Sequence, residues 1–216
     1  MIIVVNQNDE IIQLITVGEP PEGERCYVVD NIPVDIQSHI FDYKYKNRQF
    51  ILKAGAEEQR LQEAKDAKIK FLSTTCQTVI ESGIDFNGEH YSLKSTDQIN
   101  LSKLESIAAL RPTTPLFYHS DGNLCRRYTT EEILSLSQAA VAWITYHTTY
   151  FNYAKAYIDS LTTIDEVAYF KYGMTFSIEY QVPFDAIVSQ FGISFDQQID
   201  DPTDYDRIRR PLGEFL

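Results

Sequence analysis

The stretch YHSDGNLCRRYTTEEILSLSQAAVAWITYHTTYFNYAKAYIDSL, residues 118–161, decides the fold of this chain. It passes from a tight turn at Asp121-Gly122 to a helix start at Thr129, where Thr129 and Glu132 have the spacing of a capping box. After the cap, apolar residues recur at alternating steps of three and four, which places them on one helical face. We therefore predict one helix over residues 129–161, about 50 Å long at 1.5 Å per residue.

The apolar face of this helix is a packing signature and not a reaction signature. It is broad, because a second apolar row lies beside the first, and it must be buried against its own domain, a sister subunit, or both. We predict an assembly interface formed by Leu136, Ala140, Trp143, His147, Tyr150, Ala154 and Tyr157.

The composition is that of a globular protein. The 216 residues are 44% hydrophobic and 23% charged, which is enough for a sizeable core. The net charge of -12 repels polyanions, so nucleic acid is not expected as a partner. Residues 1–5 are apolar but too few for a membrane anchor, and no other segment reaches the length of a membrane helix. We therefore expect a soluble protein made in a cytoplasm, with no membrane partner.

The expected fold class is α+β: a small N-terminal antiparallel β-meander, then a mainly helical domain with two short β-hairpins and an extended C-terminal arm. A sharp change of composition near Lys53 separates strand formers from helix formers. We predict four segments: a β module over 1–53, a connecting helix over 54–83, a helical domain with two hairpins over 84–173, and a C-terminal extension over 174–216.

Turn formers and apolar periodicity give the individual elements. The predicted strands of the β module cover 2–5, 11–16, 26–29, 40–45 and 49–52. Further helices are predicted over 57–81 and 96–110, with a short one that begins at the second capping box, Thr163 to Glu166, and ends near Gly173. The predicted hairpins cover 84–93, around Asn87-Gly88, and 116–128, around 120–123.

No pattern indicates a catalytic, cofactor or metal site, so we expect a protein that is not an enzyme. His147 is expected to be a core or interface residue. A less favoured hypothesis has three copies of His147 converging on a symmetry axis to bind an ion. His90 and His119 are expected to be ordinary polar residues at strand ends, and His39 has no partner at metal-ligand spacing.

Two further sets of residues have ordinary interpretations. The aspartates of the C-terminal extension lack the glycine and the terminal glutamate of a calcium loop, and are read as a solvated face or a docking arm: Asp196, Asp200, Asp201, Asp204 and Asp206. The three cysteines show no CxxC spacing and are expected to be isolated, mostly buried thiols: Cys26, Cys76 and Cys125.

Several linked pieces of the chain resemble a known family. They are FNGEHYSL at 86–93, DQINL at 97–101, YTTEEI at 128–133, and the helix around Trp143. As an ordered set, over about residues 57–158, they resemble a helical domain of unknown function found at the C-terminal end of bacteriophage tail-fibre, baseplate and tail-fibre-assembly proteins. The resemblance implies a long helix, a hairpin, a helix, a second hairpin and a second long helix. It carries over no active-site residues, and the chain beyond about residue 174 extends past the family pattern.

The resemblance implies a structural component of a phage tail, such as a tail fibre, a fibre-attachment protein or a baseplate protein. The implied partners are other tail or baseplate proteins and copies of the chain itself, with a trimer as first hypothesis. The implied location is the tail of the virion, after synthesis in the cytoplasm of the host bacterium. Two alternatives stay open: a tail-fibre assembly chaperone, and a receptor-binding or carbohydrate-binding tail protein that acts in host attachment.

Overall fold

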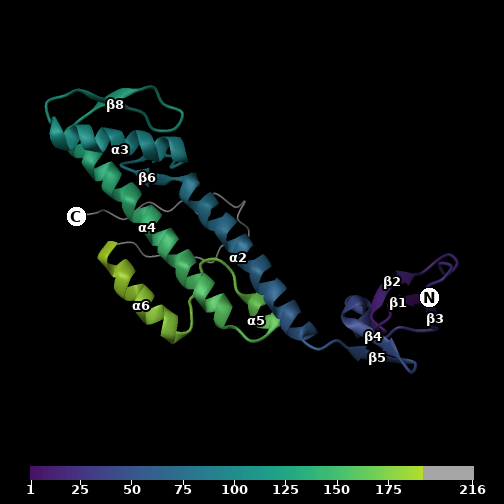
Figure 1. Ribbon diagram of the computed structural model, residues 1–216. Helices are drawn as coiled ribbons and strands as arrows, with labels where there is room; N and C mark the ends of the chain where they lie inside the picture. The colour runs from purple at the N-terminus through teal and green to yellow at the C-terminus, as the bar shows by residue number, and fades with distance from the viewer. Residues whose placement is uncertain (192–216) are drawn as a thin grey trace. The chain divides into compact units, whose positions relative to one another are not determined.

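The computed structural model describes residues 1–191 and divides into two compact units, Met1–Gln62 and the chain from Glu63 onward (Figure 1). The first unit consists mainly of strands and the second mainly of helices, which confirms the predicted α+β class. The division falls inside helix α2 (Ala56–Ser82), about two turns after its start. Most of the segment that the sequence marked as a connecting helix therefore belongs to the helical unit.

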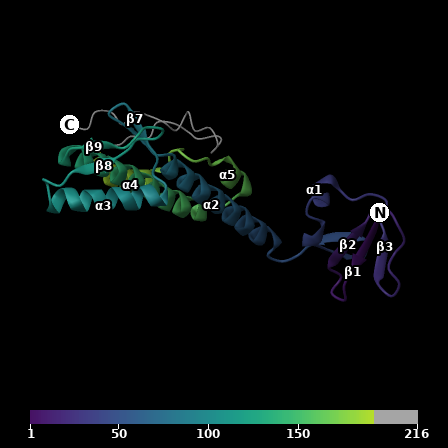
Figure 2. The ribbon, with the colours of Figure 1, turned by 90° about the horizontal axis from the view of Figure 1, so that it is seen from above.

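The N-terminal sheet is antiparallel, with β1 (Ile2–Val5) between β2 (Ile11–Ile15) and β3 (Arg25–Val28) (Figure 2). A meander would have paired β3 with β2. Instead, the loop that contains Pro20 and Pro21 carries the chain across the sheet, and β3 pairs with β1. As a consequence, β3 forms one edge of this sheet.

A second hairpin and two short helical turns complete the N-terminal unit. The elements after β3 are α1 (Val34–Gln37), the 3-10 helix η1 (Ile40–Asp42), β4 (Tyr43–Lys46) and β5 (Gln49–Leu52). The strand predicted over 40–45 thus starts at Tyr43, because Ile40 enters the core from a helical turn. The core of the unit consists of Ile3, Val5, Ile11, Val29, Ile32, Ile36, Ile40 and Tyr45.

In the helical unit, α2 and α4 (Thr130–Ser160) pack antiparallel along each other (Figure 1). Near the start of α2, Lys65 Nζ donates to the Asp159 carbonyl at 2.7 Å. Near its end, Trp143 Nε1 donates to the Val79 carbonyl at 3.3 Å. Lys65 is buried, and its ammonium meets the last turn of α4, where the helix dipole is negative and carbonyls lack helical partners.

Both predicted capping boxes are present. The Glu132 amide donates to Thr129 Oγ1 at 3.1 Å, and the Thr129 amide donates to the Glu132 carboxylate at 2.6 Å. Thr163 and Glu166 repeat the arrangement at the start of α5 (Ile164–Tyr169). These local bonds satisfy amides that every helix start leaves open.

The two predicted hairpins flank a helix. In chain order the elements are β6 (Ile84–Phe86), β7 (Glu89–Tyr91), α3 (Ser95–Leu110), β8 (Leu116–Tyr118) and β9 (Arg126–Tyr128). Asn87 and Gly88 have φ angles of 52° and 78°, as the first hairpin requires. Gly83 ends α2 at φ 88°, and a Cβ there would lie 2.0 Å from the Tyr91 carbonyl oxygen.

The first part of the C-terminal extension packs against α4 and is not an arm. It contains α6 (Ile178–Val188) and the 3-10 helix η2 (Ser189–Phe191). Phe184 on α6 is buried, and its ring centroid lies 5.7 Å from that of Tyr146 and 5.8 Å from that of Tyr150. The rest of the predicted arm, residues 192–216, lies outside the described residues, and so do the acidic positions from Asp196 onward.

Candidate functional site

The residues predicted to form an assembly interface face the interior of the chain's own helical unit. Six of the seven are buried, and Tyr157 is half-buried against Phe170, Phe176 and Tyr180. Burial within one chain therefore explains the apolar register of α4. This corrects the interface assignment of Leu136, Ala140, Trp143, His147, Tyr150, Ala154 and Tyr157, because an interface between copies has to use other residues.

A thiol, an imidazole and a phenol meet in this core. The Tyr172 hydroxyl lies 3.1 Å from His147 Nδ1, and Cys76 Sγ donates to the His147 carbonyl at 3.3 Å. Burial raises the pKa of Cys76 and of Tyr172, and it lowers the pKa of His147 to about 3. All three groups are therefore neutral at pH 7, whereas a nucleophilic cysteine acts as an accessible thiolate.

We interpret this buried cluster as a structural hydrogen-bonded group. His147 is 0% exposed. Its ring therefore cannot reach the rings of other copies at a symmetry axis. This burial excludes the hypothesis that three copies of His147 bind an ion in this fold.

A polar network connects the two hairpins to the start of α4. The Arg126 guanidinium lies 3.2 Å from Glu89, 3.0 Å from Glu132 and 3.7 Å from the centre of the Tyr128 ring. The Tyr128 hydroxyl lies 2.9 Å from that of Tyr91, which donates to Glu89 at 2.7 Å. The hydrogen bonds from Tyr91 and Arg126 lower the pKa of Glu89. Arg126 thus bridges two carboxylates, and its contacts link the two hairpins to the start of α4.

His90 and His119 behave as polar residues near strand ends, as predicted. His90 Nδ1 lies 2.6 Å from Asp85, and its Nε2 lies 2.7 Å from the Ser82 carbonyl. His119 Nδ1 lies 3.2 Å from the Ser120 carbonyl. Both ring nitrogens of His90 thus have acceptors within hydrogen-bond distance. Among residues 1–191, no group of three or more His, Cys, Asp or Glu side chains is arranged to hold a metal ion.

An open groove of about 520 Å³ lies between α2 and α4 on the surface of the helical unit. Its charged residues are Asp66 and Lys70 on α2 and Lys155 and Asp159 on α4, and Phe151 lies half-buried beside them. The two positive and two negative charges balance. The groove therefore has no preference for an anion or a cation.

The N-terminal sheet has apolar side chains on both faces. Ile3 and Val5 point into the core, so Ile2 lies on the opposite, outer face, where it stands in register between Ile15 and Val28. Val28 is 79% exposed, and Ile2 and Ile15 are half-buried. Antiparallel sheets usually carry polar residues on a solvated face. This row, Ile15–Ile2–Val28, is therefore suited to contact with protein.

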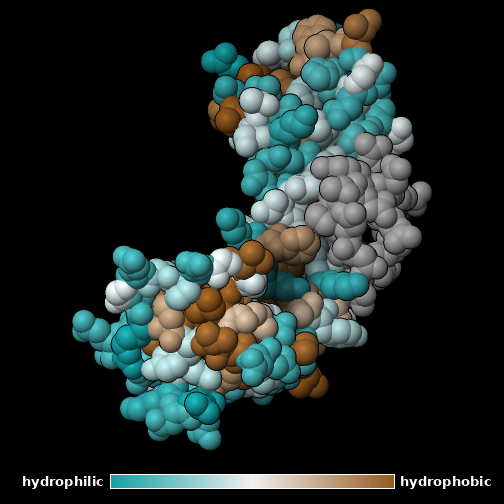
Figure 3. All heavy atoms as spheres, turned by 90° about the vertical axis from the view of Figure 1, so that its right-hand side faces the viewer, coloured by the Kyte–Doolittle hydropathy of each residue, from teal (hydrophilic) through white to brown (hydrophobic). Residues whose placement is uncertain are grey.

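The outer face was not singled out from the sequence, although the sequence contains a signal for it. Residues 2–5 form an unbroken apolar run without the alternation of a half-buried strand, which is typical of strands covered on both faces. Figure 3 shows hydrophobic side chains grouped on the side of the N-terminal unit that faces the viewer. The exposed large apolar residues of this unit are Met1, Ile12, Val17, Val28, Val34, Phe41 and Ile51.

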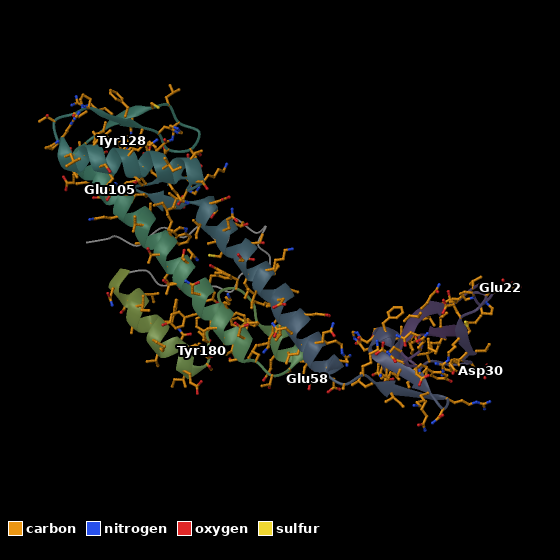
Figure 4. All side chains as sticks on the ribbon, viewed as in Figure 1. Glu22, Asp30, Glu58, Glu105, Tyr128 and Tyr180 are labelled. Carbon is orange, nitrogen blue, oxygen red and sulfur yellow. The ribbon has the colours of Figure 1, made fainter. Side chains whose placement is uncertain are left out.

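The helical unit also exposes apolar side chains. Leu110, Phe117 and Leu124 are exposed near α3 and the second hairpin, and Ile178 and Val182 are exposed on α6. The other side of α6 faces α4, where the labelled Tyr180 packs against a tyrosine of that helix at 5.7 Å (Figure 4). These side chains stay in contact with solvent after the helical unit has folded.

Comparison of the chain with protein-family models, with curated proteins and with solved structures finds no match. No helix within residues 1–191 combines the length and the apolar character needed to cross a bilayer. Exposed apolar side chains, among them Val28 at the end of the half-buried row Ile15–Ile2–Val28, are the feature that most directly indicates contact with another protein.

Proposed function

We propose that this protein is a structural component of a phage tail that acts by protein–protein assembly and not by catalysis. In this role the N-terminal unit binds a neighbouring tail or baseplate protein or another copy of the chain. The helical unit serves as a rigid body that attaches or spaces a fibre. The protein is made in the cytoplasm of the host bacterium and enters the tail of the virion.

The resemblance over residues 57–158 supports the assignment to a tail. The resemblance implies the order long helix, hairpin, helix, hairpin, long helix, and the elements α2, β6–β7, α3, β8–β9 and α4 follow one another in that order. Local signals set the start of α4 and the first hairpin independently of the resemblance. The agreement therefore supports the proposal without depending on a single motif.

The observation that carries the assembly role is the apolar row Ile15–Ile2–Val28 on the outer face of the N-terminal sheet. A partner that covers this row removes apolar side chains from water, which favours binding by about 25 cal/mol per Å². The aromatic rings of the helical unit, which a carbohydrate site would need at the surface, pack largely against one another. Tyr150, for example, packs against Tyr172 and Phe176 at 4.8 and 5.0 Å.

The decisive experiment is quantitative mass spectrometry of purified phage particles from a lysate in which the chain is made. A structural component is present at a fixed ratio to known tail proteins after gradient purification. An assembly chaperone is abundant in the lysate but absent from the particles. Loss of the chain from particles at every stage of assembly would refute the structural role. Binding of the isolated chain on a glycan array would favour the receptor alternative.

A further inference from the structure

Helix α6 carries apolar side chains on its solvent side as well as on its buried side. Phe184 and Val188 are buried, and Phe184 packs on α4 (Figure 1). On the other side, Ile178 is 77% exposed, Val182 is 60% exposed, and Ala186 is also exposed. These three residues follow one another at steps of four, so they form one outer stripe along the helix. A helix that is apolar all round is normally covered all round, so the outer stripe is suited to contact with a further segment of protein.

The charge beside the outer stripe is negative. The charged side chains of α6 are Glu179 and Asp185, and both are exposed. Pro183 has no amide, so it donates no helical hydrogen bond to the Glu179 carbonyl. The guanidinium of arginine presents five donors and pairs well with carboxylates and carbonyls. A segment that combines arginine with apolar side chains therefore fits this surface.

The end of the printed sequence, RIRRPLGEFL at residues 207–216, has this combination. Three arginines and one glutamate make the segment positive, and its large apolar residues are Ile208, Leu212, Phe215 and Leu216. Residues 192–206 have the opposite character, because they contain five aspartates and no lysine or arginine. The carboxylates of α6 repel these aspartates and attract the arginines that follow them.

The connection between α6 and this segment is short. The 3-10 helix η2 continues α6 directly, so the chain leaves the described residues at the C-terminal end of α6. Residues 192–206 can span up to about 50 Å at about 3.3 Å per residue, whereas the 11 residues of α6 extend over only about 16 Å. A short tether gives an effective concentration on the order of millimolar. The segment in the same chain therefore has an advantage over a separate partner.

The other exposed apolar group of the helical unit does not fit the same segment. It includes Leu110 and Phe117, near α3 and the second hairpin. Arg111 follows Leu110, and Arg127 stands opposite Phe117 in the register of β8 and β9. Both arginines are exposed. This surface repels a positive segment, so the charges favour α6.

We propose that residues 207–216 dock on the outer stripe of α6 in the same chain, with their arginines at the two carboxylates of the helix and their apolar side chains on the stripe. The segment then lies over α6 as a strap and removes the stripe from water. The inference goes beyond the tail assignment, because docking within one chain does not require a particle.

Hydrogen exchange of the full chain, followed by mass spectrometry, tests the docking. In the wild type, the amides of residues 207–216 should exchange at least about tenfold more slowly than in a synthetic peptide of the same sequence. Val182→Lys places a charge in the outer stripe and should return these amides to the peptide rate. The matched control is Val141→Lys, which changes a valine of α4 that is 53% exposed and should preserve the slow exchange. Peptides from α6 in the same digest report whether the helix stays folded.

A second pair of variants tests the charges without enlarging a side chain, and it decides the matter if Val182→Lys unfolds α6. Glu179→Gln combined with Asp185→Asn removes both carboxylates of α6 and should speed exchange in residues 207–216 about threefold or more. The control, Glu131→Gln combined with Asp165→Asn, removes two exposed carboxylates outside α6 and should have no effect. Added salt should speed exchange of the segment in the wild type, because it screens the attraction.

Three results would overturn the proposal. One is exchange of residues 207–216 at the peptide rate in the wild type. Another is equally slow exchange in the wild type, in Val182→Lys and in the variant without the α6 carboxylates. The third is slow exchange that appears only as the protein concentration rises, which would assign the segment to a second copy. Absence of the chain from purified virions would overturn the tail assignment and leave this inference intact.

Discussion

Acid should destabilise the helical unit through His147. This residue is 0% exposed, and burial lowers the pKa of its imidazole from 6.5 to about 3. Below pH 6.5 the unfolded chain takes up a proton on this ring, whereas the folded chain does not until the pH approaches 3. The stability contributed by the neutral ring is therefore complete above pH 6.5, and it is lost progressively as the pH falls towards 3.

The size of the effect follows from linkage between the two protonation states. Each pKa unit corresponds to about 1.4 kcal/mol. Between about pH 7 and about pH 5, protonation of the unfolded chain at this one site lowers the free energy of unfolding by about 2 kcal/mol. Such a loss is a large fraction of the stability of an ordinary domain, which is about 5–15 kcal/mol.

Trp143 gives a direct assay, because it is the one tryptophan of the chain and its ring lies 4.2 Å from that of His147. Urea unfolding followed by tryptophan emission therefore reports on the helical unit. The wild type should lose about 2 kcal/mol more than His147→Gln between about pH 7 and about pH 5. His119→Gln, at an exposed position, should behave as the wild type does. An equal loss in the wild type and His147→Gln would refute the reasoning.

Two further substitutions test local geometry in the same assay. Thr129→Ala removes the hydroxyl that accepts from the Glu132 amide, and it should lower the free energy of unfolding by about 1 kcal/mol. An unchanged free energy of unfolding would mean that water replaces this hydrogen bond without loss of stability. Gly83→Ala and Gly88→Ala both place a side chain at positive φ, at 88° and 78°. Only at Gly83 does the new Cβ meet a backbone atom, the Tyr91 carbonyl oxygen at 2.0 Å, whereas Gly88 has open space. Gly88→Ala should therefore cost about 1 kcal/mol and Gly83→Ala at least about 3 kcal/mol, and equal losses would contradict this account.

Elements set by near neighbours could be predicted from the sequence. The capping box at Thr129 and Glu132 fixes the start of α4 within one turn, and Asn87-Gly88 fixes a two-residue hairpin. In both cases the relevant hydrogen bonds and φ angles involve residues at most a few positions apart. The chain itself therefore contains the information that determines them.

Elements set by distant partners could not be predicted in the same way. Strand β3 has the same local pattern whether it pairs with β2 or with β1, and only the assembled sheet distinguishes the two. The residues around Phe184 form a helix that packs on α4, whereas the sequence analysis assigned them to an extended arm, because their partner is a distant helix. The apolar register of α4 likewise specifies that it is buried but not by which surface.

The same limit applies to the apolar face of α4, whose pattern does not say whether the chain itself or a partner buries it. A broad apolar face on a long helix and an unbroken apolar run in a short strand are both signals of burial. In the helical unit, α2 and α6 bury the residues around Tyr150, so the signal of α4 is accounted for within one chain. In the N-terminal unit, the core buries Ile3 and Val5 but leaves Val28 in solvent on the other face. Hydrophobic side chains that remain exposed after folding are those that association can still bury. The exposed apolar side chains of the N-terminal unit are therefore the better candidates for the association proposed above than the buried face of α4.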